Sequence, residues 1–235
     1  MLEQKLTGYP SIDKPWLKYY TEEAIAAPLP KCTLWENIYE HNKDYQDDTA
    51  LLYFGKKISY GKLFSEIDKT SKSLSFLKVK NGDNVAICMP AVPEAIYTIL
   101  ALNKLGANAG MLNPTFCEEQ IINRLNEMEA EVLIVVNELY TIIQNVIPKT
   151  SIKHVITCPA TNSLGKLVRM AKRVSPIPGS TSWKDFIRHG EGCTYQPAPY
   201  EEQKPAIMVF SSGTTGDSKG IQLTNDGITA TIFEY

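Results

Sequence analysis

The chain has 235 residues, a formal net charge of −2 and 43% hydrophobic residues, which suits one large or two small globular domains. The charge argues against a dedicated nucleic-acid binder, because such domains carry a strong basic excess. We expect no secretory signal, since no apolar stretch follows a basic head at the N-terminus. We also expect no membrane span, since no apolar run reaches the ~20 residues that a spanning helix needs.

The cysteines and histidines are scattered singly along the chain. None has the spacing of a zinc site or of a disulfide framework, and the number of cysteines is odd. We therefore expect small buried thiols, no metal ligands in this chain and a reducing, cytoplasmic location. The residues concerned are Cys32, Cys88, Cys117, Cys158 and Cys193, with His41, His154 and His189.

The first predicted elements lead up to two helices. Residues 1–32 are polar, aromatic and interrupted by prolines, which predicts an extended lead-in. Thr33 opens a helix, and Glu36 three residues later completes a capping box. Two β-prone runs on either side of Gly55-Lys56 predict a hairpin, and Ser59 can cap the helix that follows.

From residue 84 onward, short apolar runs alternate with helical patterns. This alternation predicts an α/β fold in which a mainly parallel β-sheet is flanked by helices on both faces. The run 131–136 has no polar alternation, as expected for a strand that is covered on both sides. The predicted strands are 84–89, 107–112, 131–136 and 153–158, and the predicted helices are 93–105, 118–128 and 139–147.

A basic segment then interrupts the alternation. Between residues 164 and 174, apolar side chains share one helical face, and Lys166, Arg169, Lys172 and Arg173 share the other. A basic amphipathic helix can lie on an anionic membrane surface, so the segment predicts a peripheral membrane contact. The alternative is a helix that covers part of the core and turns its basic face to solvent.

Near the end of the chain, a predicted strand at 205–210 runs into the loop "SSGTTGDSKG". Hydroxyls, glycines and a lysine after a strand suit a loop whose backbone N–H groups turn inward on an anion. It is not a Walker A loop, because Ser218 precedes Lys219 and Gly220 follows it. It is not a Rossmann fingerprint either, because two threonines separate Gly213 from Gly216. From these residues alone, a phosphate-binding loop and a plain surface loop both remain open.

The loop and its surroundings resemble the adenylate-forming (AMP-binding) enzymes, a superfamily of acyl-CoA synthetases, nonribosomal-peptide adenylation domains and firefly-type luciferases. "SSGTTG" followed by "KG" is similar to their phosphate-binding loop. "ISYGKL", "GDNVAI" and "GANAGMLNP" resemble three segments that precede this loop in the family. The resemblance covers residues 58–235, and "KPWLKYYTEEA" in the lead-in is similar to bacterial fatty-acid–CoA ligases. On this basis we divide the chain into the lead-in at 1–32, an N-terminal α/β subdomain at 33–204 and the start of a second subdomain at 205–235.

The resemblance implies a role for each loop residue. The residues that would hold the β- and γ-phosphates of ATP are Ser211, Ser212, Gly213, Thr214, Thr215 and Gly216. Lys219 would be the catalytic residue that neutralises the departing pyrophosphate, where charge accumulates. Two residues depart from the family pattern: Ser218 stands where the family usually has proline, and Asn225 where it often has histidine. The second departure puts a role of that position in substrate or nucleotide packing in doubt.

The implied function is that of an ATP-dependent acyl-CoA synthetase, which activates a carboxylate, here a fatty acid, as acyl-AMP and transfers it to coenzyme A. Two alternatives are an amino-acid adenylation domain that loads a carrier protein and a non-catalytic nucleotide-binding module. Family members are much longer than this chain and carry their adenine, ribose and Mg²⁺ ligands in later motifs. The resemblance therefore implies an N-terminal part that is inactive alone, and the sequence indicates neither the acyl chain length nor the oligomeric state.

Overall fold

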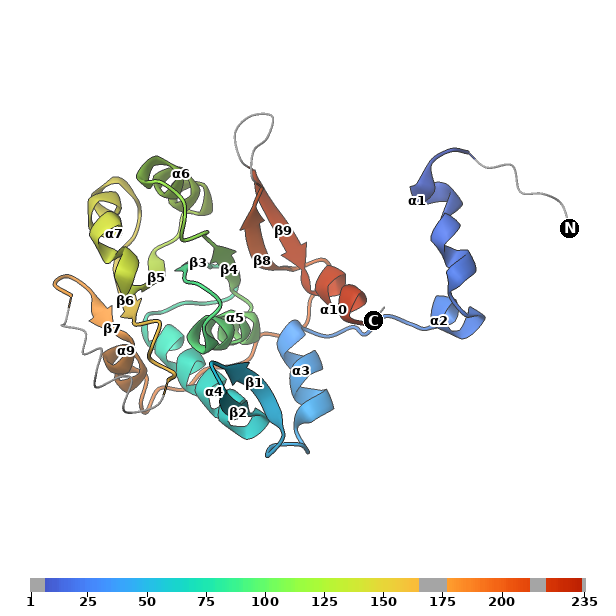
Figure 1. The fold of residues 1–235 in the computed structure, drawn as a ribbon, viewed down its shortest axis with the longest axis horizontal. Coiled ribbons are helices and arrows are strands. Elements are labelled where there is room, and N and C mark those ends of the chain that lie inside the picture. The colour runs from blue at the N-terminus through green and yellow to red at the C-terminus, as the bar shows by residue number, and fades with distance from the viewer. Residues whose placement is uncertain (1–6, 165–176, 212–218, 234–235) are drawn as a thin grey trace, which may run out of the picture.

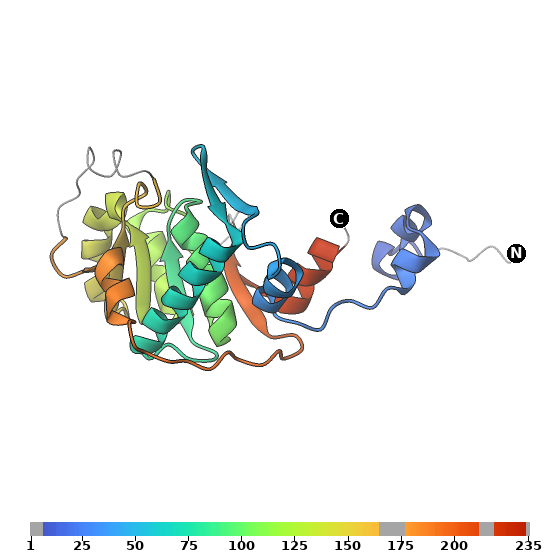
Figure 2. The same ribbon diagram turned by 90° about the horizontal axis from the view of Figure 1, so that it is seen from below.

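The computed structural model describes residues 7–164, 177–211 and 219–233 (Figure 1). The lead-in, which the sequence predicts to be extended, contains three short helices: α1 (Pro10–Asp13), η1 (Pro15–Tyr19) and α2 (Glu22–Ala26). Prolines in the first turns of α1 and η1 favour helical starts, and the Thr21 hydroxyl caps α2 by accepting a hydrogen bond from Ala24 N at 3.2 Å. Figures 1 and 2 both show these helices standing apart from the body of the molecule.

The elements of the body follow the predicted order. The capping box that opens the first long helix is confirmed, with Thr33 and Glu36 each bonding the other's backbone, and Ser59 caps the next helix. The helix predicted at 139–147 is divided into 3₁₀, α and 3₁₀ turns. The helices are α3 (Leu34–Asn42), α4 (Tyr60–Phe76), α5 (Pro93–Leu105), α6 (Glu118–Met128), η2 (Asn137–Leu139), α7 (Tyr140–Val146), η3 (Ile147–Lys149), α9 (Trp183–His189) and α10 (Asn225–Phe233).

Seven strands form one sheet in the order β7-β6-β5-β3-β4-β8-β9, and β1 and β2 form a separate hairpin. All neighbours in the large sheet are parallel except β8 and β9, which are antiparallel. The predicted α/β fold with a mainly parallel sheet is therefore confirmed. The strands are β1 (Thr49–Tyr53), β2 (Lys56–Ser59), β3 (Asn84–Cys88), β4 (Asn108–Met111), β5 (Val132–Val136), β6 (His154–Cys158), β7 (Thr181–Ser182), β8 (Pro205–Phe210) and β9 (Gly220–Thr224).

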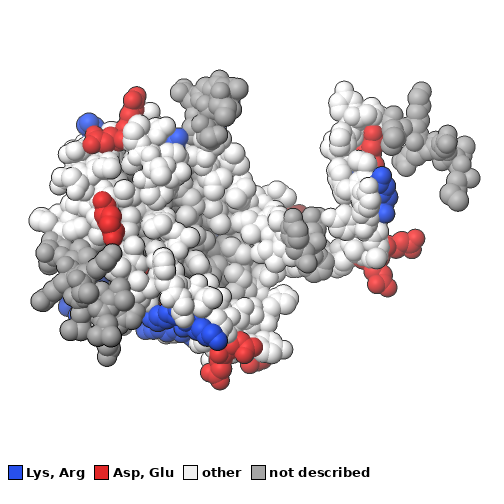
Figure 3. All heavy atoms as spheres, in the orientation of Figure 1, with Lys and Arg blue, Asp and Glu red and all other residues white. Residues whose placement is uncertain are grey.

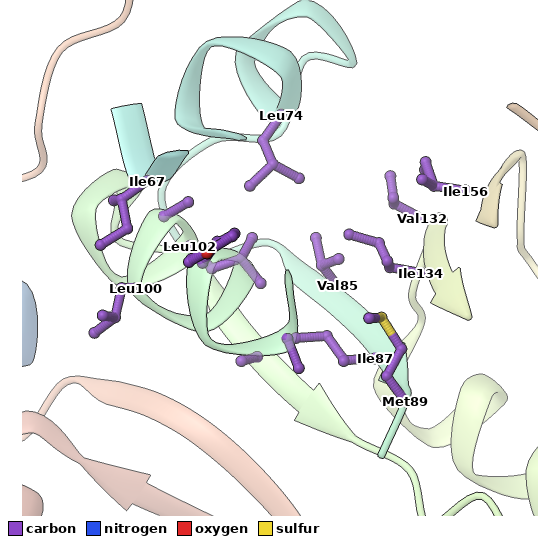
Figure 4. Packing of buried hydrophobic residues seen from close by; sticks show 14 of the residues in the cluster. Ile67, Leu74, Val85, Ile87, Met89, Leu100, Leu102, Val132, Ile134 and Ile156 are labelled. Atoms are coloured by element: carbon purple, nitrogen blue, oxygen red, sulfur yellow. The ribbon is translucent and has the colours of Figure 1, made fainter. Parts of the chain in front are cut away.

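Two hydrophobic layers enclose the central strands. Helices α3, α4, α5 and α9 cover one face of the sheet, and α6 and α7 cover the other. Successive residues of β3 point to opposite faces, so Val85 and Ile87 join the first layer while Ala86 and Cys88 join the second. Figure 4 shows side chains of α4 and α5 in the first layer facing those of β3, β5 and β6. Burial on both sides explains why β5 is apolar at every position.

The boundary proposed at residues 204 and 205 does not separate two sheets. Strand β8 extends the first sheet by pairing in parallel with β4, through Ala109 with Ile207 and Gly110 with Met208. The side of β4 that β3 leaves open offers backbone groups that need partners, and β8 supplies them. The β8–β9 hairpin therefore belongs to the same sheet as the parallel strands of residues 33–204.

The basic segment at 165–174 lies outside the described residues. The chain leading to it is anchored by Glu94, which is buried at the start of α5 and accepts hydrogen bonds from Asn162 Nδ2 at 2.7 Å and Ser163 Oγ at 2.6 Å. Lys56 of the β1–β2 hairpin donates to Ser163 O at 2.7 Å. Among the described helices, none is both long enough and apolar enough to cross a membrane.

Candidate phosphate-binding hairpin

Strands β8 and β9 form a hairpin that carries the predicted phosphate loop. Their pairing runs to Phe210 opposite Gly220. Beyond this pair, Ser211 N donates to Lys219 O at 3.2 Å, and Lys219 N donates to Ser211 Oγ at 3.2 Å. The structure thus brings Ser211 and Lys219 together as the stem of the loop. The other predicted site residues, Ser212 to Gly216, lie outside the described residues.

The hairpin places this stem beyond the carboxyl end of β4. In parallel α/β sheets, ligands bind outside the carboxyl ends of the strands. A hollow of about 280 Å³ lies there beside the start of the loop, lined by Met111, Leu112, Asn113, Phe116, Val209 and Phe210. The site is therefore a polar stem next to a mostly apolar hollow, and Lys219 of the stem is exposed.

Helix α6 packs against the base of the loop, which the sequence alone did not predict. The Arg124 guanidinium lies 3.9 Å from the ring centroid of Phe116 and 5.4 Å from that of Phe210. One turn further, Glu127 Oε1 accepts a hydrogen bond from Gly220 N at 3.1 Å. The available signal was Arg124 itself, a basic residue on the inner, apolar face of an amphipathic helix.

Asn225, one of the departures from the family pattern, joins the hairpin to two helices. Its side chain is buried, and Oδ1 accepts hydrogen bonds from Leu34 N at 3.0 Å and Asn103 Nδ2 at 2.8 Å. Asn103 Oδ1 in turn accepts from Trp35 N at 2.8 Å. These bonds satisfy the first free N–H groups of α3, which have no partner within the helix. In this chain the residue holds the end of β9 against α3 and α5.

Asp226 adds a second polar contact at the same end of the hairpin. Tyr200 donates its hydroxyl to Oδ1 of Asp226, and Gln203 N donates to Oδ2 at 2.8 Å. The bond from Tyr200 is the main reason that the pKa of Asp226 is lowered, because it favours the charged carboxylate. The same bond raises the pKa of Tyr200 to about 12.

The donors in and around the hairpin determine which kind of cofactor it could hold. Among the described residues, no group of three His, Cys, Asp or Glu side chains could hold a metal ion. For a polyphosphate, the chemistry of the donors fits: the loop sequence supplies hydroxyls, backbone N–H groups and the Lys219 ammonium. All five cysteines are free thiols, and Cys88 and Cys158 are buried as expected, whereas Cys117 is exposed.

The fold and the hairpin define a class of protein. It is an α/β domain whose parallel strands β4, β3, β5, β6 and β7 lie side by side in a flavodoxin-like order, extended by a hairpin that carries a Ser-, Thr- and Gly-rich loop. A family model described as "AMP-binding enzyme" matches residues 38–235. The chain belongs to this family.

Relatives of known name are acetyl-coenzyme A synthetases. The protein of Helicobacter acinonychis is 27% identical over 97% of this chain, and acetyl-coenzyme A synthetase 1 of Candida albicans is 28% identical over 77% of it. The chain spans 36% of the length of the first relative and 28% of the second.

Solved structures establish the fold. An anthranilate CoA ligase in complex with anthranoyl-AMP superposes with a TM-score of 0.72 at 23% identity, over 86% of this chain and 36% of the ligase. A long-chain-fatty-acid–CoA ligase of Archaeoglobus fulgidus gives a TM-score of 0.69 at 21% identity, over 87% of this chain and 39% of that one. A red-emitting luciferase of Phrixothrix hirtus gives a TM-score of 0.73 at 19% identity, over 88% of this chain and 39% of the luciferase.

Proposed function

We propose that the gene product containing these residues is an AMP-forming acid–thiol ligase, which joins a carboxylate to coenzyme A at the expense of ATP. The observation that carries the proposal is the β8–β9 hairpin. It closes the predicted phosphate loop with two Ser211–Lys219 hydrogen bonds, in a chain that belongs to the AMP-binding enzymes. The names of the relatives and of two structural neighbours support a CoA ligase.

The reaction has two steps. A carboxylate oxygen attacks the α-phosphorus of ATP, the bond to the β-phosphate oxygen breaks, and pyrophosphate leaves. The thiol of coenzyme A, losing its proton, then attacks the carbonyl carbon of the acyl-adenylate, and AMP leaves. A mixed anhydride with AMP has a good leaving group, which is how ATP activates an otherwise inert carboxylate.

The loop acts in the first step. Ser211, Ser212, Thr214 and Thr215 would donate hydroxyl hydrogens to the β- and γ-phosphate oxygens, and Gly213 and Gly216 would let the backbone N–H groups approach. Lys219 would place its ammonium where the leaving pyrophosphate gains charge. Mg²⁺ supplies positive charge to the same phosphates when bound, and we assign it no ligand in this chain.

The carboxylate remains to be identified. The resemblance of the lead-in favours a fatty acid, whereas the curated relatives are named acetyl-coenzyme A synthetases. Acetate is therefore the first substrate to test and fatty acids the second. We further propose a cytoplasmic location, which five free thiols suit, a peripheral membrane contact through residues 164–174, and no nucleic-acid partner. On the face in Figure 3, a small basic group over the β1–β2 hairpin lies beside an acidic one, and no wide basic surface is visible.

Pyrophosphate exchange tests the proposal. The purified gene product is incubated with ATP, Mg²⁺, labelled pyrophosphate and one carboxylate at a time, from acetate through fatty acids to amino acids. We expect label to enter ATP with a simple carboxylate, and a thioester to form when coenzyme A is added. Exchange with amino acids and loading of a carrier protein would identify the adenylation-domain alternative. No exchange with any carboxylate would leave a nucleotide-binding module. The 235-residue chain alone is expected to be inactive, because the site must hold all reactants together.

Variants of the loop separate the two steps. Lys219→Ala or Thr215→Val should slow exchange roughly 10- to 100-fold, since a hydrogen bond to a charged group contributes ~1.5–3 kcal/mol and ~1.4 kcal/mol is tenfold in rate. Thioester formation from supplied acyl-adenylate should stay within about threefold, below ~1 kcal/mol, because that intermediate has lost both phosphates. Lys184→Ala, which removes an exposed lysine of α9, is the matched control. Equal losses in both steps would show that the loop does not act on the pyrophosphate.

A further inference from the structure

The tip of the β8–β9 hairpin extends beyond the support of the sheet. Pairing between β8 and β4 is limited to Ile207 and Met208, so Val209 and Phe210 lie past the last paired residues. Strand β9 is the edge of the sheet and pairs only with β8 among the described strands. The stem of the loop therefore needs contacts other than the strand ladder to keep a fixed position.

Arg124 supplies such a contact to the strand that enters the loop. Arg124 is only 5% exposed, and its guanidinium lies over the ring of Phe116 and over that of Phe210, the residue immediately before Ser211. Nη1 donates to Gln120 O at 2.8 Å, which fixes the plane of the group on its own helix. The described residues offer Arg124 no ion pair. Its interaction with Phe210 is thus a desolvated cation–π contact, the stronger kind.

Glu127 supplies the contact to the strand that leaves the loop. Its Oε1 accepts the hydrogen bond from Gly220 N, the residue immediately after Lys219. A Cβ on residue 220 would lie 2.9 Å from this oxygen, so glycine there permits the close approach. Arg124 and Glu127 are three positions apart and thus neighbours on one face of α6. One face of one helix therefore holds both ends of the loop.

We propose that Arg124 and Glu127 are positioning residues for adenylate formation. They hold the two ends of the stem, at Phe210 and at Gly220, so that Ser211 and Lys219 keep a fixed position when the triphosphate binds. Preorganised donors spare the cost of reorganisation during the reaction, and they keep their geometry only when a second layer of contacts supports them. This inference rests on the proposed function, because it assigns to α6 a role in the step that uses the loop.

The helix itself does not need Glu127 for its stability. Ile121, Leu125 and Met128 bury the inner face of α6 against the sheet, whereas Glu127 is exposed. Loss of an exposed side chain of this kind changes stability little. A kinetic effect of Glu127 can therefore be measured on a folded protein.

The experiment uses the gene product that contains this chain. Glu127→Ala should raise the KM for ATP and slow pyrophosphate exchange by about 10-fold, the equivalent of ~1.4 kcal/mol, while thioester formation from supplied acyl-adenylate stays within about threefold. Glu127→Gln keeps an acceptor for Gly220 N and should restore exchange to within about threefold. Glu119→Ala is the matched control, because Glu119 is an exposed acid of α6 with no side-chain hydrogen bond among the described residues.

Arg124 is tested with Arg124→Lys, which keeps the charge but loses the planar group that lies over the two rings. The same pattern is expected: slower exchange, a higher KM for ATP and an unchanged second step. Thermal unfolding of each variant identifies those that do not fold. If Arg124→Lys does not fold, Phe210→Leu replaces it, because this change removes the aromatic partner of the same contact.

The outcomes are distinct. If the wild type is active and Glu127→Ala exchanges pyrophosphate at the wild-type rate, the positioning role is overturned and the proposed function stays intact. Equal losses in both steps, or no recovery in Glu127→Gln, also overturn it, because the residue would then act on the structure as a whole. Wild type without exchange on any carboxylate overturns the proposed function and the positioning role with it.

Discussion

The centre of the sheet and the loop-bearing hairpin are stabilised in different ways. Strand β5 is buried at all five positions and needs no polar side-chain contact, whereas Ile221 and Leu223 of β9 are 47% and 38% exposed. The hairpin is instead held by individual polar contacts, from Glu127 at its tip and from Asn225 and Asp226 at its base. The centre of the sheet thus depends on buried apolar area, whereas the position of the hairpin depends on a few hydrogen bonds.

The largest effect should come from breaking the scaffold. Leu133 of β5 is fully buried, so Leu133→Ala removes buried methyl groups and leaves a cavity, at a cost of about 2.7–5 kcal/mol in the free energy of unfolding. Leu52→Ala, at a strand position that is 69% exposed, should cost less than about 0.5 kcal/mol. Urea unfolding of this chain, followed by circular dichroism, measures both. Similar midpoints for the two variants would contradict the comparison.

The base of the hairpin should give an intermediate effect. Asn225→Ala leaves Leu34 N and Asn103 Nδ2 buried without their acceptor, and an unsatisfied buried group costs about 1–3 kcal/mol. We expect a loss of roughly 2–3 kcal/mol, because one of the two donors can relax toward another acceptor. Gln222→Ala, at an exposed position of β9, serves as the control in the same unfolding assay. A loss as small as that of the control would show that packing alone holds the hairpin to α3 and α5.

The smallest effect should depend on pH. The folded pKa of Asp226 is lowered, so its contribution to stability is present above the unfolded pKa of about 3.9 and is lost as the pH falls through the lower, folded value. Asp226 is partly exposed to solvent, so Asp226→Asn should cost less than about 1 kcal/mol at pH 7. The gap between variant and wild type should close below about pH 4.

Unfolding midpoints of Asp226→Asn and wild type, measured at steps between pH 7 and pH 2.5, check this dependence. Asp47→Asn, which removes an exposed carboxylate without a side-chain hydrogen bond among the described residues, is the control in the same series. A gap that stays constant to the lowest pH would assign the effect of Asp226 to packing.

The difference between the buried centre of the sheet and the polar contacts of the hairpin also explains which features the sequence predicted. Periodicity reports burial, so it located α5 and α6 to the residue and the central strands to within a residue or two. It missed β7, which has two residues and no pattern, and it did not reveal that β8 pairs with β4, because local sequence does not encode strand partners. The polar composition of the lead-in predicted an extended segment, whereas its prolines and the Thr21 cap favour three short helices.

The roles of the loop residues stay a prediction from resemblance, and the contacts of α6 with the stem of the loop were not predicted. Arg124 and Glu127 lie about ninety residues before the loop, and only the three-dimensional packing of α6 brings them to Phe210 and Gly220. The Asn225 departure was recognised from the sequence, but its bonds to α3 and α5 depend on a contact between distant segments.

The pairing of β8 with β4 also has a consequence for how the chain folds. Ala109 finds its partner in Ile207, so the hairpin joins the sheet by closing a long stretch of chain, whereas β3 and β4 pair across a single helix. Contacts of long sequence separation form slowly, because the loss of chain entropy precedes the gain from the contact. During synthesis the inner strands are complete before β8 and β9 emerge. The predicted phosphate loop is thus added to a sheet that already exists, and until then β4 leaves an unpaired edge on which another strand could pair.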